Sequence, residues 1–439
     1  MKALLLHAGL ALLVLVGAGS AAAADGPVAI RAGRLIDVRN SRVVEHAIVL
    51  VRGAKIEAVG AGLAIPPDAR VIDLSSATVL PGLIDCHTHL VGDASDLDPL
   101  ADVRKTAAQV AYEALPNARR TLEAGFTTVR DVGTFRAFVD LALRDAIARG
   151  DVVGPRVFGA GAYVTITGGG GALNGLAPDV RLPLDLRFGV ADGPDQVRQR
   201  VREIAGYGAD LIKVLATGAF LTHKSDPGAE ELTFEELSAA VGEAKKRGLR
   251  VAAHAHGAEG IKNAVRAGVA SIEHGTFIDE EGIRLMKERG TYLVADIYDD
   301  DYIVSEEARK KGIPKDFLEK ESDAGRIQRE NFRRAVRAGV RIAYGTDAGV
   351  YPHGDNAKQF AYQVKFGQTP MEAIRSATIV AADLIGKPGE FGSIDPGKSA
   401  DLIAVEGDPL ADITRLERVT FVMKEGRVVK GPAPRPGGL

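Results

Sequence analysis

The sequence predicts an α/β protein made of a (β/α)8 TIM barrel and a small β-sandwich domain formed by both ends of the chain. Three observations lead to this prediction. Strand-like and helix-like segments alternate through the middle of the chain, glycine recurs between a helix and the strand that follows, and β-rich segments occur at both ends. Eight strand–helix repeats favour a closed barrel over an open sheet, because the TIM barrel needs that number of parallel strands.

The expected barrel strands are mostly apolar on both faces, as strands between a barrel interior and a helix layer should be. They are predicted near residues 79–87, 126–131, 156–161, 210–215, 250–256, 270–274, 291–296 and 341–347. Several follow a helix that ends in a glycine, such as Gly125, Gly248 and Gly339. Glycine adopts the left-handed conformation just past a helix end without strain, so it indicates where each helix stops.

Sequence character divides the chain into four parts. Residues 1–24 hold a lysine, an apolar run and small residues that match an A-x-A cleavage pattern, which is typical of a secretory signal peptide. A retained membrane anchor is the alternative. The protein is therefore expected to be periplasmic or secreted, with no membrane contact after cleavage. Residues 25–80 and 392–439 are expected to form the β-sandwich, and residues 81–391 the barrel.

Composition narrows the function classes. The 439 residues are 46% hydrophobic and 26% charged, which is ordinary for a globular enzyme. The net charge is −3 and no basic block occurs, so nothing favours nucleic acid as a partner. The single cysteine, Cys86, excludes an intramolecular disulfide.

Side chains that can bind metal ions occur at the ends of the predicted strands. His87 and His89 end the first strand, and His254 and His256 end the fifth. Alternate residues on a strand share a face, so both members of each pair can point inward. Three more polar side chains lie on other strands: Lys213, His274 and Asp347. A single buried histidine pair is often only hydrogen-bonded, but convergence from five strands indicates a site for zinc or a similar divalent ion.

The segment at 81–89, PGLIDCHTH, resembles the first-strand signature of the amidohydrolase superfamily. The segments at 392–394 (GSI) and 397–403 (GKSADLI) resemble the return into its β-sandwich. The resemblance covers essentially the whole mature chain. It is closest to the imidazolonepropionase-like and Xaa-Pro dipeptidase branch, which includes amidohydrolases that hydrolyse ochratoxin A. It implies a small-molecule amide substrate and a homo-oligomer, up to an octamer.

The resemblance also implies two divalent metal ions, with zinc as the expected metal. The implied ligands are His87, His89 and Asp347 for the more buried ion, His254 and His274 for the second, and Lys213 as a bridge. Lys213 would carry a CO2-derived carbamate, because a free lysine is a cation and a poor ligand. Asp347 would take a proton from the attacking water and pass it to the departing amine.

Contacts to the substrate are less clearly indicated. His256 shares strand parity with His254, so either could be the ligand. The family pattern favours His254, which leaves His256 as a catalytic residue that touches the substrate or the oxyanion. The other candidates for substrate binding are Gly169, Gly170, His223 and Tyr298. A solvated loop position for His223 and a packed aromatic ring for Tyr298 are the alternatives.

The expected reaction is hydrolysis of an amide bond in an N-acyl amino acid or a dipeptide, with ochratoxin A, cleaved to ochratoxin alpha and phenylalanine, as one candidate. Opening of a cyclic amide or imidazolone, deamination and lactone hydrolysis are alternatives on the same site. A metal-free, non-catalytic scaffold is the remaining alternative, and the presence of all six expected ligands disfavours it.

Overall fold

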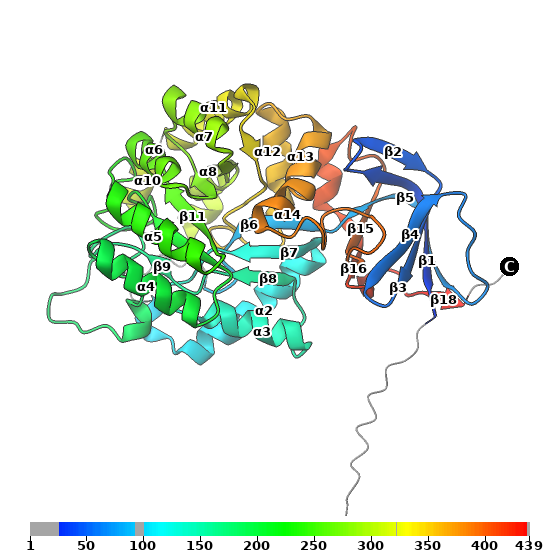
Figure 1. Cartoon of the computed structure of the whole chain (residues 1–439), viewed down its shortest axis with the longest axis horizontal. Coiled ribbons are helices and arrows are strands. Elements are labelled where there is room, and N and C mark those ends of the chain that lie inside the picture. The colour runs from blue at the N-terminus through cyan, green and yellow to red at the C-terminus, as the bar shows by residue number, and fades with distance from the viewer. Residues whose placement is uncertain (1–25, 93–100, 322, 437–439) are drawn as a thin grey trace, which may run out of the picture.

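The computed structural model describes residues 26–92, 101–321 and 323–436, which form a barrel with an outer layer of helices and a smaller β-rich part beside it (Figure 1). The expected signal peptide at residues 1–24 lies outside the described residues, so it stays a prediction. Within the described part of the chain, no helix combines the length and the apolar character needed to span a membrane.

Eight parallel strands build the barrel, and each overlaps one of the predicted segments. They are β6 (Leu83–Thr88), β7 (Phe126–Asp131), β8 (Arg156–Gly159), β10 (Leu211–Leu215), β11 (Arg250–Ala255), β12 (Ser271–His274), β13 (Tyr292–Val294) and β14 (Arg341–Ile342). The last strand returns to the first, since the Cys86 N–H donates to the Tyr344 carbonyl at 2.8 Å. The Asp210 N–H donates to the Gly159 carbonyl at 2.9 Å and links the two groups of strands. The predicted fold class is confirmed.

The third strand differs from the prediction because it is broken. Instead of one strand over 156–161, β8 ends at Gly159 and a short strand β9 (Tyr163–Val164) follows. Gly161 between them has a φ of 77°, which is left-handed and interrupts an extended strand. The break lets β9 pair with β10 next to Lys213.

Helices cover the outside of the barrel, and many end as the sequence predicts. Gly150, Gly268, Gly290 and Gly339 cap their helices in the left-handed conformation. The longer helices are α2 (Ala107–Glu123), α3 (Val139–Arg149), α4 (Pro194–Gly206), α5 (Phe234–Lys246), α6 (Ala258–Ala267), α7 (Glu280–Arg289) and α11 (Ala324–Ala338). The shorter ones are α1 (Ala101–Arg104), α8 (Asp299–Ile303), α9 (Glu306–Lys310), α10 (Lys315–Glu321), α12 (Gln359–Lys365), α13 (Pro370–Ser376) and α14 (Ile379–Ile385).

Both ends of the chain supply the small domain. Its main strands lie in the order β17 (Arg427–Lys430), β16 (Val419–Lys424), β15 (Leu402–Glu406), β5 (Arg70–Pro81), β1 (Val28–Asp37), β3 (Ala47–Arg52) and β4 (Lys55–Ala61). Two short strands, β2 (Arg42–Glu45) and β18 (Arg435–Pro436), pair with β1 and β5. One buried cluster joins Ile403 and Val419 of this domain to Leu122 and Phe126 of the barrel. Shared apolar burial therefore fixes the domain against the barrel, since each buried aliphatic side chain stabilises the folded state by about 1.5–3 kcal/mol.

Candidate metal centre

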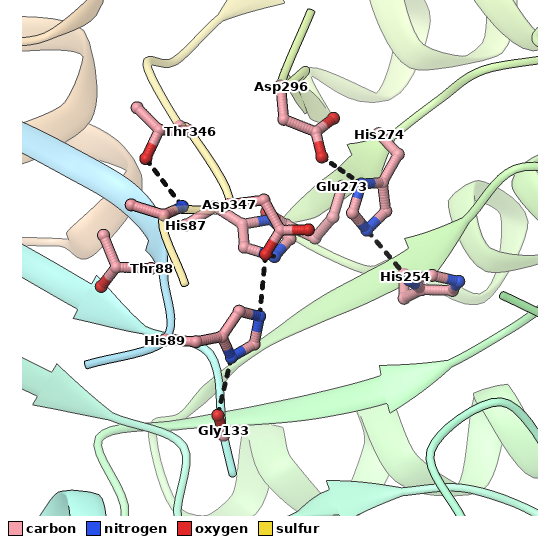
Figure 2. A network of polar contacts seen from close by, with 12 residues as sticks. His87, Thr88, His89, Gly133, His254, Glu273, His274, Asp296, Thr346 and Asp347 are labelled. Carbon is pink, nitrogen blue, oxygen red and sulfur yellow. Dashed lines mark hydrogen bonds and ion pairs between the residues drawn. The ribbon is translucent and has the colours of Figure 1, made fainter. Parts of the chain in front are cut away.

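Five of the predicted ligands, His87, His89, His254, His274 and Asp347, lie close together in the barrel (Figure 2). Asp347 Oδ1 lies 3.4 Å from His87 Nε2 and 3.0 Å from His89 Nε2. His254 Nδ1 lies 2.9 Å from His274 Nε2. The ring centroids of His87 and His274 are 4.9 Å apart, so the two groups form one continuous centre. These side chains and Lys213 line the same cavity.

The backbone is strained at two of these positions. His274 has a φ of 66° and Asp347 a φ of 54°, in the left-handed region. Such a conformation costs on the order of 1–3 kcal/mol for a residue other than glycine, and it persists only where the surrounding structure holds it. Both side chains turn into the cavity where their strands end. The strain therefore coincides with the site and indicates that the placement is functional.

Four imidazoles are oriented through the ring nitrogen that faces away from the centre. The contacts are His87 Nδ1 to Glu273 Oε2 at 3.0 Å, His89 Nδ1 to the Gly133 carbonyl at 2.8 Å, His274 Nδ1 to Asp296 Oδ2 at 2.6 Å and His254 Nε2 to the Gly218 carbonyl at 3.0 Å. Each acceptor takes the ring N–H and so fixes the tautomer. In a neutral ring the remaining nitrogen then turns a lone pair toward the centre, which is the arrangement of metal-binding histidines, whereas a protonated ring donates from it, as His89 does to Asp347.

The contact between His254 and His274 indicates whether a cation fits between their rings. With both far nitrogens donating, two lone pairs would face each other at 2.9 Å and repel. A shared cation removes this repulsion, either as a proton or as a metal ion. Although burial opposes it, the Asp296 carboxylate raises the pKa of His274, while burial lowers the pKa of His254 well below its ordinary value. The Asp296 carboxylate therefore favours a positive charge on the His274 side of this pair.

Lys213 is buried, and its Nζ has no hydrogen-bond partner among the described residues. An unpaired ammonium group in the interior is costly. Burial lowers the pKa of Lys213 to about 8, so the neutral amine is accessible near physiological pH. A neutral amine adds to CO2 and loses a proton to become a carbamate, which supplies two oxygen donors. The unpartnered amine lines the same cavity as the four imidazoles and Asp347, and its surroundings thus fit a carbamate.

Sequence reasoning missed the residues that hold the ligands. Arg130 Nη2 donates to both oxygens of Glu273, at 2.8 and 2.9 Å, and so holds the carboxylate that contacts His87. Gln328 Nε2 donates to Asp296 Oδ1 at 3.0 Å. A signal was present, because Glu273 directly precedes a predicted ligand and Asp296 ends the seventh predicted strand. Neither position shares a motif with the ligands, so only the folded geometry assigns the contact.

The cavity above the ligands has a volume of about 230 Å³. Its walls come from the loops at 170–174 and 219–223 and from helices α8 and α10. Three described clusters of histidine and carboxylate side chains could hold a metal ion: His254 with His256 and His274; His87 with His274 and Asp347; and Asp296 with Asp299 and Asp347. Metal-binding side chains thus form the floor of a cavity large enough to admit a small molecule.

Comparison with known proteins agrees with this geometry, because residues 78–429 match the amidohydrolase family. The chain belongs to that family. This confirms the resemblance and the predicted enzyme class, a hydrolase.

Three relatives of this amidohydrolase are informative. The ochratoxinase of Aspergillus niger is 33% identical over 383 residues, which cover 82% of this chain and 77% of that one. Its crystal structure has a TM-score of 0.83 at 30% identity and covers 93% of this chain and 97% of that chain. A crystal structure of an Xaa-Pro dipeptidase with methionine bound in its active site has a TM-score of 0.87 at 40% identity and covers 92% and 100%. The imidazolonepropionase of Fusobacterium nucleatum is 25% identical and covers 89% and 93%.

Geometry separates the two histidines at the end of β11 in this amidohydrolase. His254 Nδ1 faces His274 Nε2, which is the nitrogen pair expected of two ligands of one ion. His256 Nδ1 instead contacts Thr276 Oγ1 at 2.8 Å, and the His256 ring borders the cavity beside Phe220. This arrangement favours His254 as the ligand and leaves His256 available to the substrate.

The remaining substrate candidates have different outcomes. Gly170 and His223 line the cavity, and the His223 ring centroid lies 4.8 Å from that of Phe317. Gly169 does not line it, because the residue packs against protein: an added Cβ would lie 2.6 Å from Glu231 Oε2. Tyr298 does not line it either, and its ring packs on those of Tyr351 and Tyr362 at 5.0 and 5.3 Å. Gly169 and Tyr298 are therefore absent from the described lining of this cavity, and substrate binding by them stays a prediction.

Tyr163 is a cavity residue that the sequence gave no reason to select. Its hydroxyl donates to the Gly133 carbonyl at 3.1 Å and lies 3.3 Å from His89 Nδ1. The same carbonyl accepts from His89, so Tyr163 helps to fix the orientation of that ring. The break in the third strand brings Tyr163 to this position, and strand periodicity cannot predict such a break.

Proposed function

We propose that this amidohydrolase is a binuclear metal-dependent enzyme that hydrolyses the amide bond of dipeptides or N-acyl amino acids. The observation that carries the proposal is the set of four imidazoles whose near nitrogens face one centre with Asp347 and the unpartnered Lys213 amine. Zinc is the proposed metal, since imidazole and carboxylate donors suit it.

The proposed ligands divide into two groups. His87, His89 and Asp347 would hold one ion, His254 and His274 the other, and carboxylated Lys213 both. When bound, such a pair of ions lowers the pKa of a water to about 7 and polarises the substrate carbonyl. The protein supplies the orientation, because Glu273, Asp296 and two backbone carbonyls fix the imidazole rings before the substrate enters.

Asp347 is the proposed proton carrier. Against the effect of burial, contacts with His87 and His89 hold the pKa of its carboxyl well below the usual range. The group is therefore ionised at rest and can accept a hydrogen bond from the attacking water. It would take the proton of that water as the carbonyl carbon is attacked. It would then return the proton to the nitrogen of the leaving amine as the C–N bond breaks.

His256 is the proposed oxyanion contact. Burial lowers the pKa of this histidine well below its ordinary value, so the ring is neutral and carries one N–H. A neutral donor at the cavity wall can hydrogen-bond the substrate carbonyl oxygen, and this contact strengthens as negative charge develops in the transition state. The fixed position of the ring beside Thr276 supports this role.

The names of the relatives support amide substrates. An Xaa-Pro dipeptidase and an ochratoxinase are both similar to this chain, and these names indicate dipeptides and ochratoxin A as candidates. Similarity to an imidazolonepropionase keeps ring opening of an imidazolone as the second candidate. We propose amide hydrolysis first because the two amide-cleaving relatives are more similar, at 40% and 33% identity against 25%.

A hydrolysis screen tests this function. Zinc-loaded protein is incubated with dipeptides, N-acyl amino acids, ochratoxin A, an imidazolone and a lactone, and free amino acid is measured. We expect cleavage of at least one linear amide, with chelation abolishing it and zinc restoring it. Turnover of the imidazolone or the lactone alone would contradict amide hydrolysis. Equal turnover after chelation would contradict metal dependence.

A further inference from the structure

One wall of the cavity presents hydrogen-bond acceptors that have no donor. The atoms are Asp300 Oδ2 on α8, Glu321 Oε2 on α10 and Gln328 Oε1 on α11, and each is buried without a hydrogen-bond partner among the described residues. The residues are only 8%, 4% and 3% exposed, and all three line the cavity. Buried polar atoms are normally hydrogen-bonded, so three unsatisfied acceptors on one wall need an explanation.

The orientation of the Gln328 amide follows from its partner. Its Nε2 donates to Asp296 Oδ1, and the other oxygen of Asp296 contacts His274. The NH2 group must face this acceptor, because a carboxylate cannot donate to a carbonyl oxygen. The Gln328 carbonyl oxygen is therefore left as a buried acceptor without a donor among the described residues. This acceptor is independent of the two carboxyl groups.

The two carboxyl groups share a single proton. A side-chain hydrogen bond between Asp300 and Glu321 lowers the pKa of Asp300 and raises that of Glu321, which favours a single proton on the pair with Glu321 as its carrier. Burial raises the pKa of Asp300 to about 6 and that of Glu321 well above its ordinary value. Removal of a carboxylate from water without a counter-ion has this effect. A cation placed on this wall would lower the pKa values of both carboxyl groups.

Nearby protein cations are directed elsewhere. The Arg329 guanidinium is 4.0 Å from Asp300 Oδ2 but binds Asp301 Oδ1 at 2.7 Å. Lys320 donates to the carbonyls of Phe220 and Thr222. Among the described lining residues, Lys213 is the only lysine or arginine, and it belongs to the metal centre. The wall formed by Asp300, Glu321 and Gln328, here called the acceptor wall, therefore has Arg329 at ion-pair distance from Asp300 but no described hydrogen-bond donor to the three oxygen atoms named above.

We propose that the substrate carries a cationic nitrogen group, an ammonium or a guanidinium, that binds the acceptor wall. This inference rests on the proposed function and names the substrate class of the same site. An ammonium offers three N–H donors and a guanidinium five, which suits three separate acceptors around one negative charge. The cation can be the α-ammonium of a dipeptide or a basic side chain. Neutral and anionic substrates leave the wall unsatisfied and are disfavoured, which argues against ochratoxin A, a carboxylic acid.

The test compares substrates with and without a cationic nitrogen group. Nα-acetyl-L-norleucine lacks the cation, Nα-acetyl-L-lysine carries it on the side chain, and L-alanyl-L-norleucine carries it on the α-nitrogen. We expect kcat/KM of the zinc-loaded enzyme to be at least about tenfold higher for one cationic substrate, which is the effect of about 1.4 kcal/mol of charge-assisted hydrogen bonding. The substrate with the higher kcat/KM shows whether the cation is the α-ammonium group or a group on the side chain.

Two variants test whether the acceptor wall causes the preference for cationic substrates. Asp300→Asn removes the negative charge. Glu321→Leu removes an acceptor and fills the same space with an apolar side chain. We expect either change to reduce the preference to within about twofold. The matched control is Glu319→Gln, an exposed carboxylate on the same helix, which should keep the full preference. Equal kcat/KM for neutral and cationic substrates in the unmodified enzyme would overturn the proposal while leaving amide hydrolysis intact.

A binding measurement separates this proposal from the hydrolytic function. The full chain is titrated calorimetrically with L-lysine, L-alaninamide, L-norleucine and N-acetyl-L-norleucinamide, which require no turnover. Tighter binding of a cationic ligand than of N-acetyl-L-norleucinamide, lost in Asp300→Asn, would support the acceptor wall even if no amide in the screen were cleaved. Equal binding of all four ligands would overturn it.

Discussion

Replacing Lys213 with methionine is expected to lower kcat/KM by at least about 10³-fold, or about 4 kcal/mol at about 1.36 kcal/mol per tenfold. The reason is the loss of the proposed bridge between the two metal-binding groups, which the Lys213 carbamate would supply. Methionine fills the buried position with an apolar chain of similar length. The measurement is steady-state hydrolysis of the best substrate by zinc-loaded variant and unmodified enzyme, together with the metal content of both.

Stability distinguishes this effect from unfolding. Lys213 Nζ makes no hydrogen bond within the described residues, so the methionine variant should unfold at the same or a higher denaturant concentration. Lys224→Met, at an exposed residue of the following loop, is the control and should keep full activity. After equilibration with ¹³C-bicarbonate, a carbamate carbon resonance should be visible in the unmodified protein and absent from Lys213→Met. Normal turnover by a folded Lys213→Met variant would refute the bridge.

The change Asp347→Asn is expected to lower kcat by about 10³-fold, within the range for loss of a general base. An amide of the same shape still offers an oxygen to a metal ion but cannot take the proton of the attacking water. Metal content should therefore fall much less than turnover. The measurements are kcat under substrate saturation and metal analysis of the same protein sample.

Two comparisons make the Asp347→Asn result specific. Asp145→Asn, an exposed carboxylate on α3, should leave both kcat and metal content unchanged. KM for the substrate should also change little in Asp347→Asn, because the proposed role concerns proton transfer rather than ground-state binding. A variant that keeps its metal and turns over at the normal rate would exclude Asp347 as the base.

The sequence predicted the barrel because a barrel depends on simple periodicities. Eight strand–helix repeats placed His87, Lys213, His274 and Asp347 on or just after barrel strands, and a barrel brings its strand ends to one rim. The alternation of side chains along a strand put His89 beside His87. The assignment of these residues as metal ligands came from the family resemblance.

Details that depend on loop geometry were not predictable. Tyr298 follows the seventh strand, but its ring turns into an aromatic cluster, and residue spacing does not fix the direction of a chain once its strand has ended. Gly169 packs on Glu231 for the same reason. The acidic run at 299–301 suggests a solvated helix start, and only the packing of α10 over it reveals that Asp300 is buried.

The central claim is that side chains from five barrel strands hold a pair of metal ions. The most direct measurement is metal analysis by mass spectrometry of the purified chain after equilibration with zinc and removal of free metal. We expect about two zinc ions per chain, falling to about one or fewer in His254→Ala, which removes a proposed ligand of one ion only. A chain that retains no stoichiometric metal, with unchanged hydrolysis, would contradict the account.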